Sequence, residues 1–156
     1  MSVIIQGFQL RTAQFGQQVI KGPSTLPAGT TATLATVAGG AILITSCLGL
    51  ITTVMSGTAT TLALGTAPTI GSANTGGIAA AGTVTSLQAG VWAVPVVNAG
   101  AAGTLTVGAT AGAAPYLPTP FVVTSGLITW TTTGTNTGAM KWYFTYVALD
   151  IGANLS

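Results

Sequence analysis

The strongest fold signal in this chain is GTNTGAMKWYFTYVALD, residues 134–150. It opens with Gly, Asn and Thr residues typical of a turn and continues into the longest aromatic run of the sequence. Side chains along a strand point alternately to its two sides, and here both sides are apolar. One set is Met140, Trp142, Phe144 and Tyr146, and the other is Tyr143, Val147 and Leu149. An outer strand of a monomer would show one polar side, so we expect this strand to be central in a packed sandwich or covered by another subunit.

Further strands are indicated on both sides of this stretch by Thr, Val, Ile and Leu residues interrupted by Gly, Pro, Asn or Ser. The segments concerned are TTATLATV (30–37), AILITSCLGLITTVM (41–55), ATTLALGT (59–66) and FVVTSGLITWTTTG (121–134). Short strands separated by turn signals predict an all-β, antiparallel sandwich or barrel. Within 41–55, Gly49 is interpreted as a bulge or a break between two short strands.

The middle of the chain carries weaker signals. Residues 70–90 are small and polar and predict a long loop, with a short strand or helix at 78–81. Pro95 suits an edge strand, and a Gly- and Ala-rich connector follows it. No exact repeat or linker divides the chain, so we expect one domain, with residues 1–29 as an N-terminal arm or first strand and residues 30–156 as the β-sandwich.

Charge is nearly absent, and this excludes several classes of function. The 156 residues hold three Lys and Arg, one Asp and no His, which gives a net charge of +2. Three scattered cations cannot neutralise a phosphate backbone, so we expect no nucleic acid partner. One carboxylate and one thiol supply no catalytic triad, carboxylate pair or metal site. We therefore expect no enzyme, metal, cofactor or small-molecule substrate, and interpret Cys47 as a small buried hydrophobic residue.

The mean hydropathy of +0.72 raises the question of a membrane. Residues 37–55 are long enough for a spanning helix and carry no charge. Gly, Thr and Ser recur through them, however, and neither flank holds basic or aromatic anchors. We therefore do not expect a membrane partner, and a membrane-embedded protein is the lowest of three functional alternatives.

The stretch GLITWTTTGTNTGAMKWYFTYVALDIGA (126–153) resembles the closing hairpin of capsid decoration, or cement, proteins of tailed bacteriophages. In that family a Thr-rich strand, a Gly/Asn/Thr turn and an aromatic strand commonly lead into a PLD-x-GA ending, from which Ala148 departs. Upstream, 39–54 and 61–69 are similar to the family's early strands. The resemblance implies a jelly-roll-like β-sandwich on the outside of a phage capsid, with the major capsid protein as partner, and a homotrimer.

Candidate contacts to a partner or to other subunits come from both ends of the chain. Arg11, Phe15 and Lys21 lie in the N-terminal segment, which would rest on the major capsid protein or on a neighbouring subunit if it is an arm. The aromatic strand contributes Trp142, Phe144 and Tyr146.

Asp150 has two interpretations. It forms a salt bridge with Arg11, Lys21 or Lys141, or it is a turn residue after the last long strand, which we favour. Trp130 and Trp142 are expected to fill the core rather than bind sugar. The Thr-rich runs suggest an ice-binding array only if they repeat in register, and no such repeat is visible.

We therefore expect a structural virion protein: a capsid cement protein, made in the host cytoplasm and located on the virion surface. The alternative is a phage tail or fibre component that binds a host surface.

Overall fold

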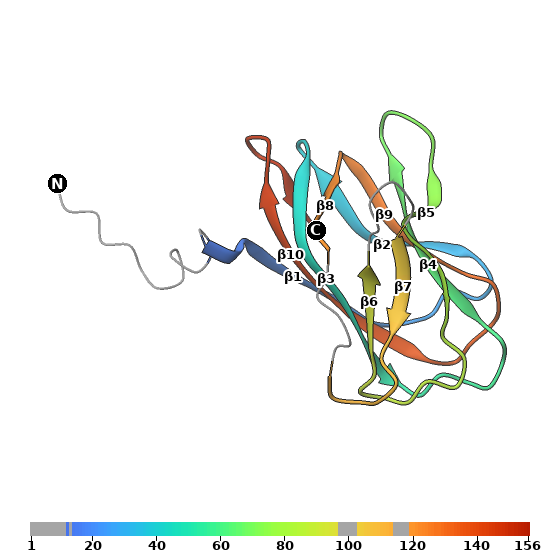
Figure 1. Cartoon of the computed structure of the whole chain (residues 1–156). Helices are drawn as coiled ribbons and strands as arrows, with labels where there is room; N and C mark the ends of the chain where they lie inside the picture. The colour runs from blue at the N-terminus through green and yellow to red at the C-terminus, as the bar shows by residue number, and fades with distance from the viewer. Residues whose placement is uncertain (1–11, 13, 97–102, 114–118) are drawn as a thin grey trace.

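The chain is almost entirely β-structure in a computed structural model, which describes residues 12, 14–96, 103–113 and 119–156 (Figure 1). The strands are β1 Gln17–Thr25, β2 Thr31–Ala38, β3 Ile42–Thr53, β4 Thr61–Pro68, β5 Asn74–Thr83, β6 Trp92–Val96, β7 Gly103–Val107, β8 Phe121–Val123, β9 Gly126–Thr132, β10 Ala139–Ala148 and β11 Asn154–Leu155. The all-β prediction is confirmed. No helix in this part of the chain has the length and apolar character needed to cross a bilayer.

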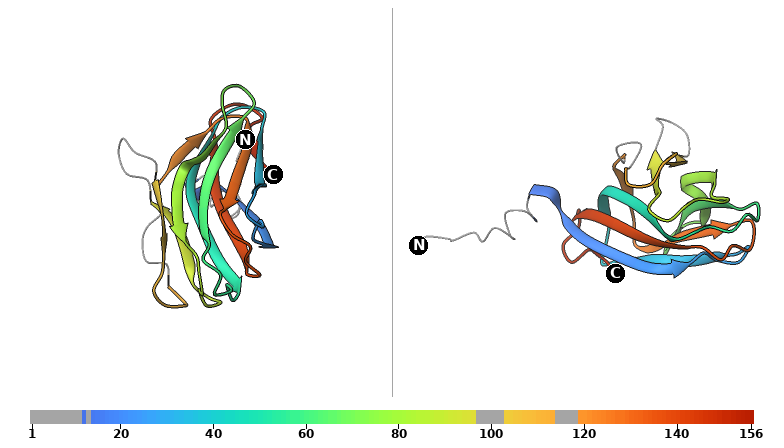
Figure 2. Two further views of the ribbon diagram at one scale, coloured as in Figure 1. Left: turned by 90° about the vertical axis from the view of Figure 1, so that its right-hand side faces the viewer. Right: turned by 90° about the horizontal axis from the view of Figure 1, so that it is seen from below.

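The strands form one continuous sheet in the order β1-β10-β3-β6-β7-β5-β4-β9-β2-β11, with β8 beside β3. The sheet curls back on itself (Figure 2), so that strands distant in this order face each other across the core. We call β1, β10, β3, β6 and β8 layer A, and β5, β4, β9 and β2 layer B. The order 1-10-3-6 opposite 2-9-4-5 is that of a jelly roll.

Strand β7 joins the two layers on one side of the sandwich. It pairs antiparallel with β6 and parallel with β5 through Ala79–Gly103 and Ala80–Thr104. This parallel pair is the one departure, among the described strand pairs, from the antiparallel sheet expected from the sequence. Because β7 connects β5 to β6, the sheet is continuous where a simple sandwich would be open.

The core lies between the layers and is built from alternate positions of the strands. In β10 these are Met140, Trp142, Phe144 and Tyr146, all buried. Trp142 packs edge-on against Trp130 of β9, with ring centroids 6.4 Å apart and an interplanar angle of 84°. This contact joins layer A to layer B and confirms that both tryptophans are core residues.

Gly49 is neither a bulge nor a break, so that interpretation was wrong. Strand β3 runs through it without interruption, with Trp142 as its partner on β10. A Cβ atom at this position would lie 2.8 Å from Met140 Cε and 3.0 Å from the Trp142 ring. The absent side chain therefore makes room for the indole.

The predictions for the middle of the chain were also wrong in part. Strand β5, with 10 residues, occupies the centre of the expected loop at 70–90 and extends well beyond the short strand or helix expected at 78–81, and the Gly- and Ala-rich connector contains β7. Pro95 lies inside the sheet, paired with Leu105 of β7, and is not on an edge strand. Pro95 is tolerated because β6 pairs with β3 only through Trp92 and Ala93, so the sheet makes no ladder with β3 at Pro95.

The N-terminal segment enters the sandwich through β1. Residues Gln17–Thr25 pair with β10 from Gln17–Tyr146 to Thr25–Ala139, so this part of the 1–29 segment is a strand of layer A. The arm interpretation concerns the residues before it, of which 1–11 and 13 lie outside the described part of the chain.

Candidate functional site

No metal-binding cluster is found among the described residues. No three His, Cys, Asp or Glu side chains come together there. Cys47 is buried in the core, and this burial raises the pKa of its thiol far above the usual value. A thiol that stays protonated is a poor nucleophile and a poor metal ligand, in line with its interpretation as a small core residue.

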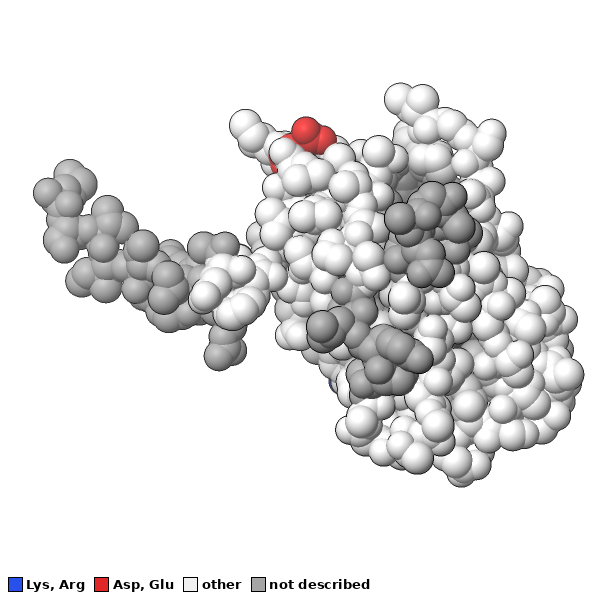
Figure 3. All heavy atoms as spheres, viewed as in Figure 1, with Lys and Arg blue, Asp and Glu red and all other residues white. Residues whose placement is uncertain are grey.

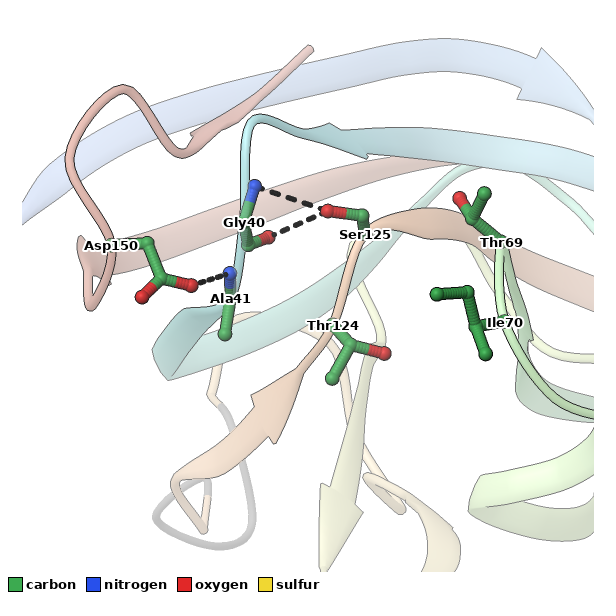
Figure 4. A pocket seen from close by; sticks show the side chains of 7 residues that line it. All are labelled: Gly40, Ala41, Thr69, Ile70, Thr124, Ser125 and Asp150. Atoms are coloured by element: carbon green, nitrogen blue, oxygen red, sulfur yellow. Dashed lines mark hydrogen bonds between the residues drawn. The ribbon is translucent and has the colours of Figure 1, made fainter.

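The clearest surface feature is a hollow of about 500 Å³ at one end of the sandwich (Figure 4). Four connections meet there: β2 to β3, β4 to β5, β8 to β9, and β10 to β11. The lining residues are Gly40, Ala41, Thr69, Ile70, Thr124, Ser125 and Asp150. We call this group, with Leu149 and Ile151 beside Asp150, the loop end.

Hydrogen bonds between side chains and backbone tie the loop end together. Ala41 donates its backbone N–H to Asp150 Oδ2 at 2.6 Å. The Ser125 hydroxyl accepts from the Gly40 N–H at 3.0 Å and donates to the Gly40 carbonyl at 3.1 Å (Figure 4). A carboxylate that accepts a backbone N–H forms one of the stronger hydrogen bonds in proteins. These contacts give the β2–β3 connection a fixed position.

Gly40 fits this arrangement because it lacks a side chain. Its φ of +139° is strained for other residues, and a Cβ atom would lie 2.5 Å from Asp150 Cβ. Asp150 also accepts the Ala153 N–H through its backbone carbonyl. These contacts match the turn interpretation of Asp150, which thus positions the loop end.

Large aliphatic side chains project from the loop end into solvent. Ile70 is 91% exposed, Ile151 is fully exposed and Leu149 is 52% exposed. Leu149 and Ile151 are the chain neighbours of Asp150, and Ile70 lies across the hollow from it (Figure 4). Asp150 is the chain's one side-chain carboxylate, and it stands at the upper edge of an otherwise almost uncharged face in Figure 3. Exposed apolar groups that gather in one place are typical of an interaction surface.

The structure separates the candidate contact residues into core and surface. Trp142, Phe144 and Tyr146 are buried within the chain, and a partner would meet their neighbours on the other side of β10 instead. Their selection as partner contacts was therefore wrong. Both sides of the strand are apolar, and the sequence does not show which side faces the core. The Tyr146 hydroxyl donates to Gln17 Oε1 at 2.7 Å and so anchors β1.

The remaining candidates lie outside the core or outside the described chain. Phe15 is 61% exposed just before β1. Lys21 is half-buried on β1, and Arg11 is not among the described residues.

The outer side of layer A carries the second apolar side of the aromatic strand, with Tyr143 and Val147, together with apolar residues of other strands that the sequence alone did not single out. Tyr143 of β10 packs against Trp92 of β6, with ring centroids 5.7 Å apart, and the Lys141 ammonium lies 5.3 Å from the centre of the Tyr143 ring. Ile20 of β1 is the strand partner of Tyr143 and is 47% exposed. Val19 and Ile20 are adjacent, so in a strand one of them faces the core and the other faces outward. The sequence does not show that Ile20 lies beside Tyr143, because that depends on the register between β1 and β10.

The outer side of layer B is different in character and carries mainly Thr, Ala and Gly. Thr hydroxyls pair across its strands: Thr31 Oγ1 lies 2.7 Å from Thr131 Oγ1, and Thr61 Oγ1 lies 3.0 Å from Thr133 Oγ1. Thr129, two residues before Thr131 on β9, is buried. These hydroxyls are therefore engaged with one another.

Comparisons with protein-family models, with curated proteins and with solved structures find no match for this chain.

Proposed function

We propose that this chain is a capsid decoration protein of a tailed bacteriophage. It binds the major capsid protein on the outside of the head, as a homo-oligomer, and stabilises the shell through neutral and apolar contacts. It performs no chemistry of its own.

The jelly-roll order of the strands supports this proposal. Jelly rolls occur in viral capsid proteins, and also in lectins and cupins. A fold alone does not decide function, so the argument depends on which groups the fold presents. Cupin chemistry needs a metal site, and no group of three His, Cys, Asp or Glu side chains is found among the described residues.

The loop end is the observation on which the proposal depends. Ile70, Leu149 and Ile151 are exposed on connections held by Asp150 and Ser125. Fully burying one such side chain contributes about 1.5–3 kcal/mol. A preorganised apolar surface of this kind suits attachment to a large, neutral partner, because little conformational entropy is lost on binding. We therefore assign shell binding to the loop end.

A binding assay on shells that lack this protein tests the proposal. The shells are those encoded by the genome that carries this gene, and co-sedimentation measures how much added protein binds per major capsid protein. We expect saturable binding of the unmodified chain. Ile70→Glu and Ile151→Glu should each weaken it at least tenfold, because a charge would be buried at the contact.

Val54→Glu is the matched control. Val54 is also an exposed aliphatic residue, at 47%, but it follows β3 at the opposite end of the sandwich from the loop end. This variant should bind like the unmodified chain. Binding to purified tails and not to shells would support the tail or fibre alternative and overturn the proposal, and equal loss in all three variants would refute the assignment of the loop end.

A further inference from the structure

Apolar side chains form rows across the outer side of layer A. Strand register places Ile20, Tyr143 and Leu48 side by side on β1, β10 and β3. A second row joins Val147, Leu43 and Val122 on β10, β3 and β8, and a third joins Lys141, Leu50 and Trp92 on β10, β3 and β6. We call these three rows the layer A face.

Three members of the layer A face remain well exposed in the single chain. Ile20, Val122 and Val147 are 47%, 58% and 42% exposed. The solvent-facing side of an antiparallel sheet is ordinarily polar, as the Thr-rich outer side of layer B shows. The layer A face therefore has the composition of a covered surface.

The charges of the chain favour a second copy as the covering partner. Lys141 is the only charged member of the three rows, and its ammonium lies over the Tyr143 ring. An isologous contact brings the same surface of two copies together, and like charges are the usual obstacle to it. The layer A face has one cation, and that cation already lies against an aromatic ring, so two copies of the face should repel each other little.

The sheet edges disfavour the other common mode of self-association, in which strands of two copies pair side by side. Strand β1, at one end of the described sheet, carries Lys21 and Pro23 and a register shift between Lys21 and Ser24. Lys, Pro and bulges are the features that block edge pairing. At the other end, β11 has only 2 residues.

The size of the layer A face is sufficient for a stable contact. Strands β1, β10 and β3 have 9, 10 and 12 residues, and β6 and β8, with 5 and 3 residues, pair with different parts of β3. With strands about 4.8 Å apart and a rise of about 3.3 Å per residue, these four positions span roughly 19 Å by 32 Å, or about 600 Å² in outline. Side-chain relief increases this area toward the roughly 800 Å² per partner that specific interfaces bury.

We infer that a second copy of this chain packs on the layer A face. The inference adds to the proposed function the surface through which copies associate, and it stands independently of shell binding. Face-to-face packing of two sheets would cover Ile20, Val122 and Val147 and leave the loop end free.

Light scattering on size-exclusion chromatography tests the inference. The unmodified chain should elute at a multiple of its 15.2 kDa mass, and Ile20→Glu and Val122→Glu should shift it to the monomer mass. Ile70→Glu is the matched control, because the same change on the loop end should weaken shell binding but leave the mass unchanged. Circular dichroism checks that each variant keeps its strand content. A monomeric unmodified chain, or Ile20→Glu and Val122→Glu proteins that keep the oligomer mass, would overturn the inference.

Thiol labelling gives a second readout that does not depend on a disruptive variant. Thr145→Cys places a thiol on the outer side of β10, whereas native Cys47 is buried and stays protonated. Maleimide labelling of the thiol introduced at position 145 should slow at least several-fold as protein concentration rises, since the second copy covers this position. Thr31→Cys, on the outer side of layer B, should label at a constant rate. Equal concentration dependence at both positions would contradict a contact through layer A.

Discussion

Gly49 shows how one missing side chain sets the geometry of the core. We predict that Gly49→Ala lowers the free energy of unfolding by about 1–3 kcal/mol, the usual cost of overpacking, because the added Cβ would meet the Met140 Cε and Trp142 ring at 2.8–3.0 Å. Urea unfolding measures this change. Gly57→Ala is the control, since its Cβ would meet only Ser86 Oγ, at 3.7 Å. Equal stability of the two variants would show that Trp142 has room to move.

Asp150 has a structural part in the loop end that can be separated from its charge. Its carboxylate accepts the Ala41 N–H, so Asp150→Ala leaves that donor without its partner and should lower the free energy of unfolding by about 1–2 kcal/mol. Asp150→Asn keeps an acceptor oxygen and should lose less. Thermal unfolding of the two variants measures the difference. An Asp150→Asn protein as unstable as Asp150→Ala would indicate that the charge itself, through an ion pair, is what matters.

Among the strands, β10 shows both what sequence reasoning could establish and where it stops. Its alternating aromatic residues predicted a strand with two apolar sides. Which side faces the core depends on the register with β3 and β1 and on the contact with Trp130. That information is non-local, so Trp142, Phe144 and Tyr146 were assigned to a partner although they lie in the core.

Strand β7 was missed, and β5 was expected only as a short strand or helix at 78–81, for a different physical reason. In β5, NTGGIAAAGT, more than half of the residues are Gly or Ala, which are depleted in strands, and β7, GTLTV, is only 5 residues long. Close packing requires small residues here: a Cβ on Gly82 would lie 2.4 Å from the Leu105 carbonyl oxygen of β7. The loop end could not be predicted from the sequence either, because its residues come from four connections that are far apart in the chain.

Adjacent residues of β10 should respond in opposite ways to substitution. Trp142→Ala should cost about 3–5 kcal/mol of stability, the usual loss for a buried aromatic residue, because the side chain is fully buried. Tyr143→Ala lies on the layer A face, so it should cost much less stability but weaken self-association. Urea unfolding and light scattering on both variants measure the two effects. Similar stability losses with no change in mass would argue against a functional outer side of β10.

For the whole molecule, the scarcity of charge predicts how attachment depends on solution conditions. Exposed ion pairs are worth about 0–1 kcal/mol each, and the chain has only four charged side chains. We therefore expect shell binding to persist when salt rises from about 0.1 M to about 1 M, where the Debye length falls to about 3 Å. Urea or detergent should release the protein. Co-sedimentation across both series measures this, and release by salt alone would point to an electrostatic contact.

Cryo-electron microscopy of the particles encoded by the same genome would examine the proposed function itself. We predict density for this jelly roll on the outer surface of the head, with Ile70 and Ile151 of the loop end against the major capsid protein. Heads without such density, or density for the chain on the tail alone, would contradict a capsid decoration protein.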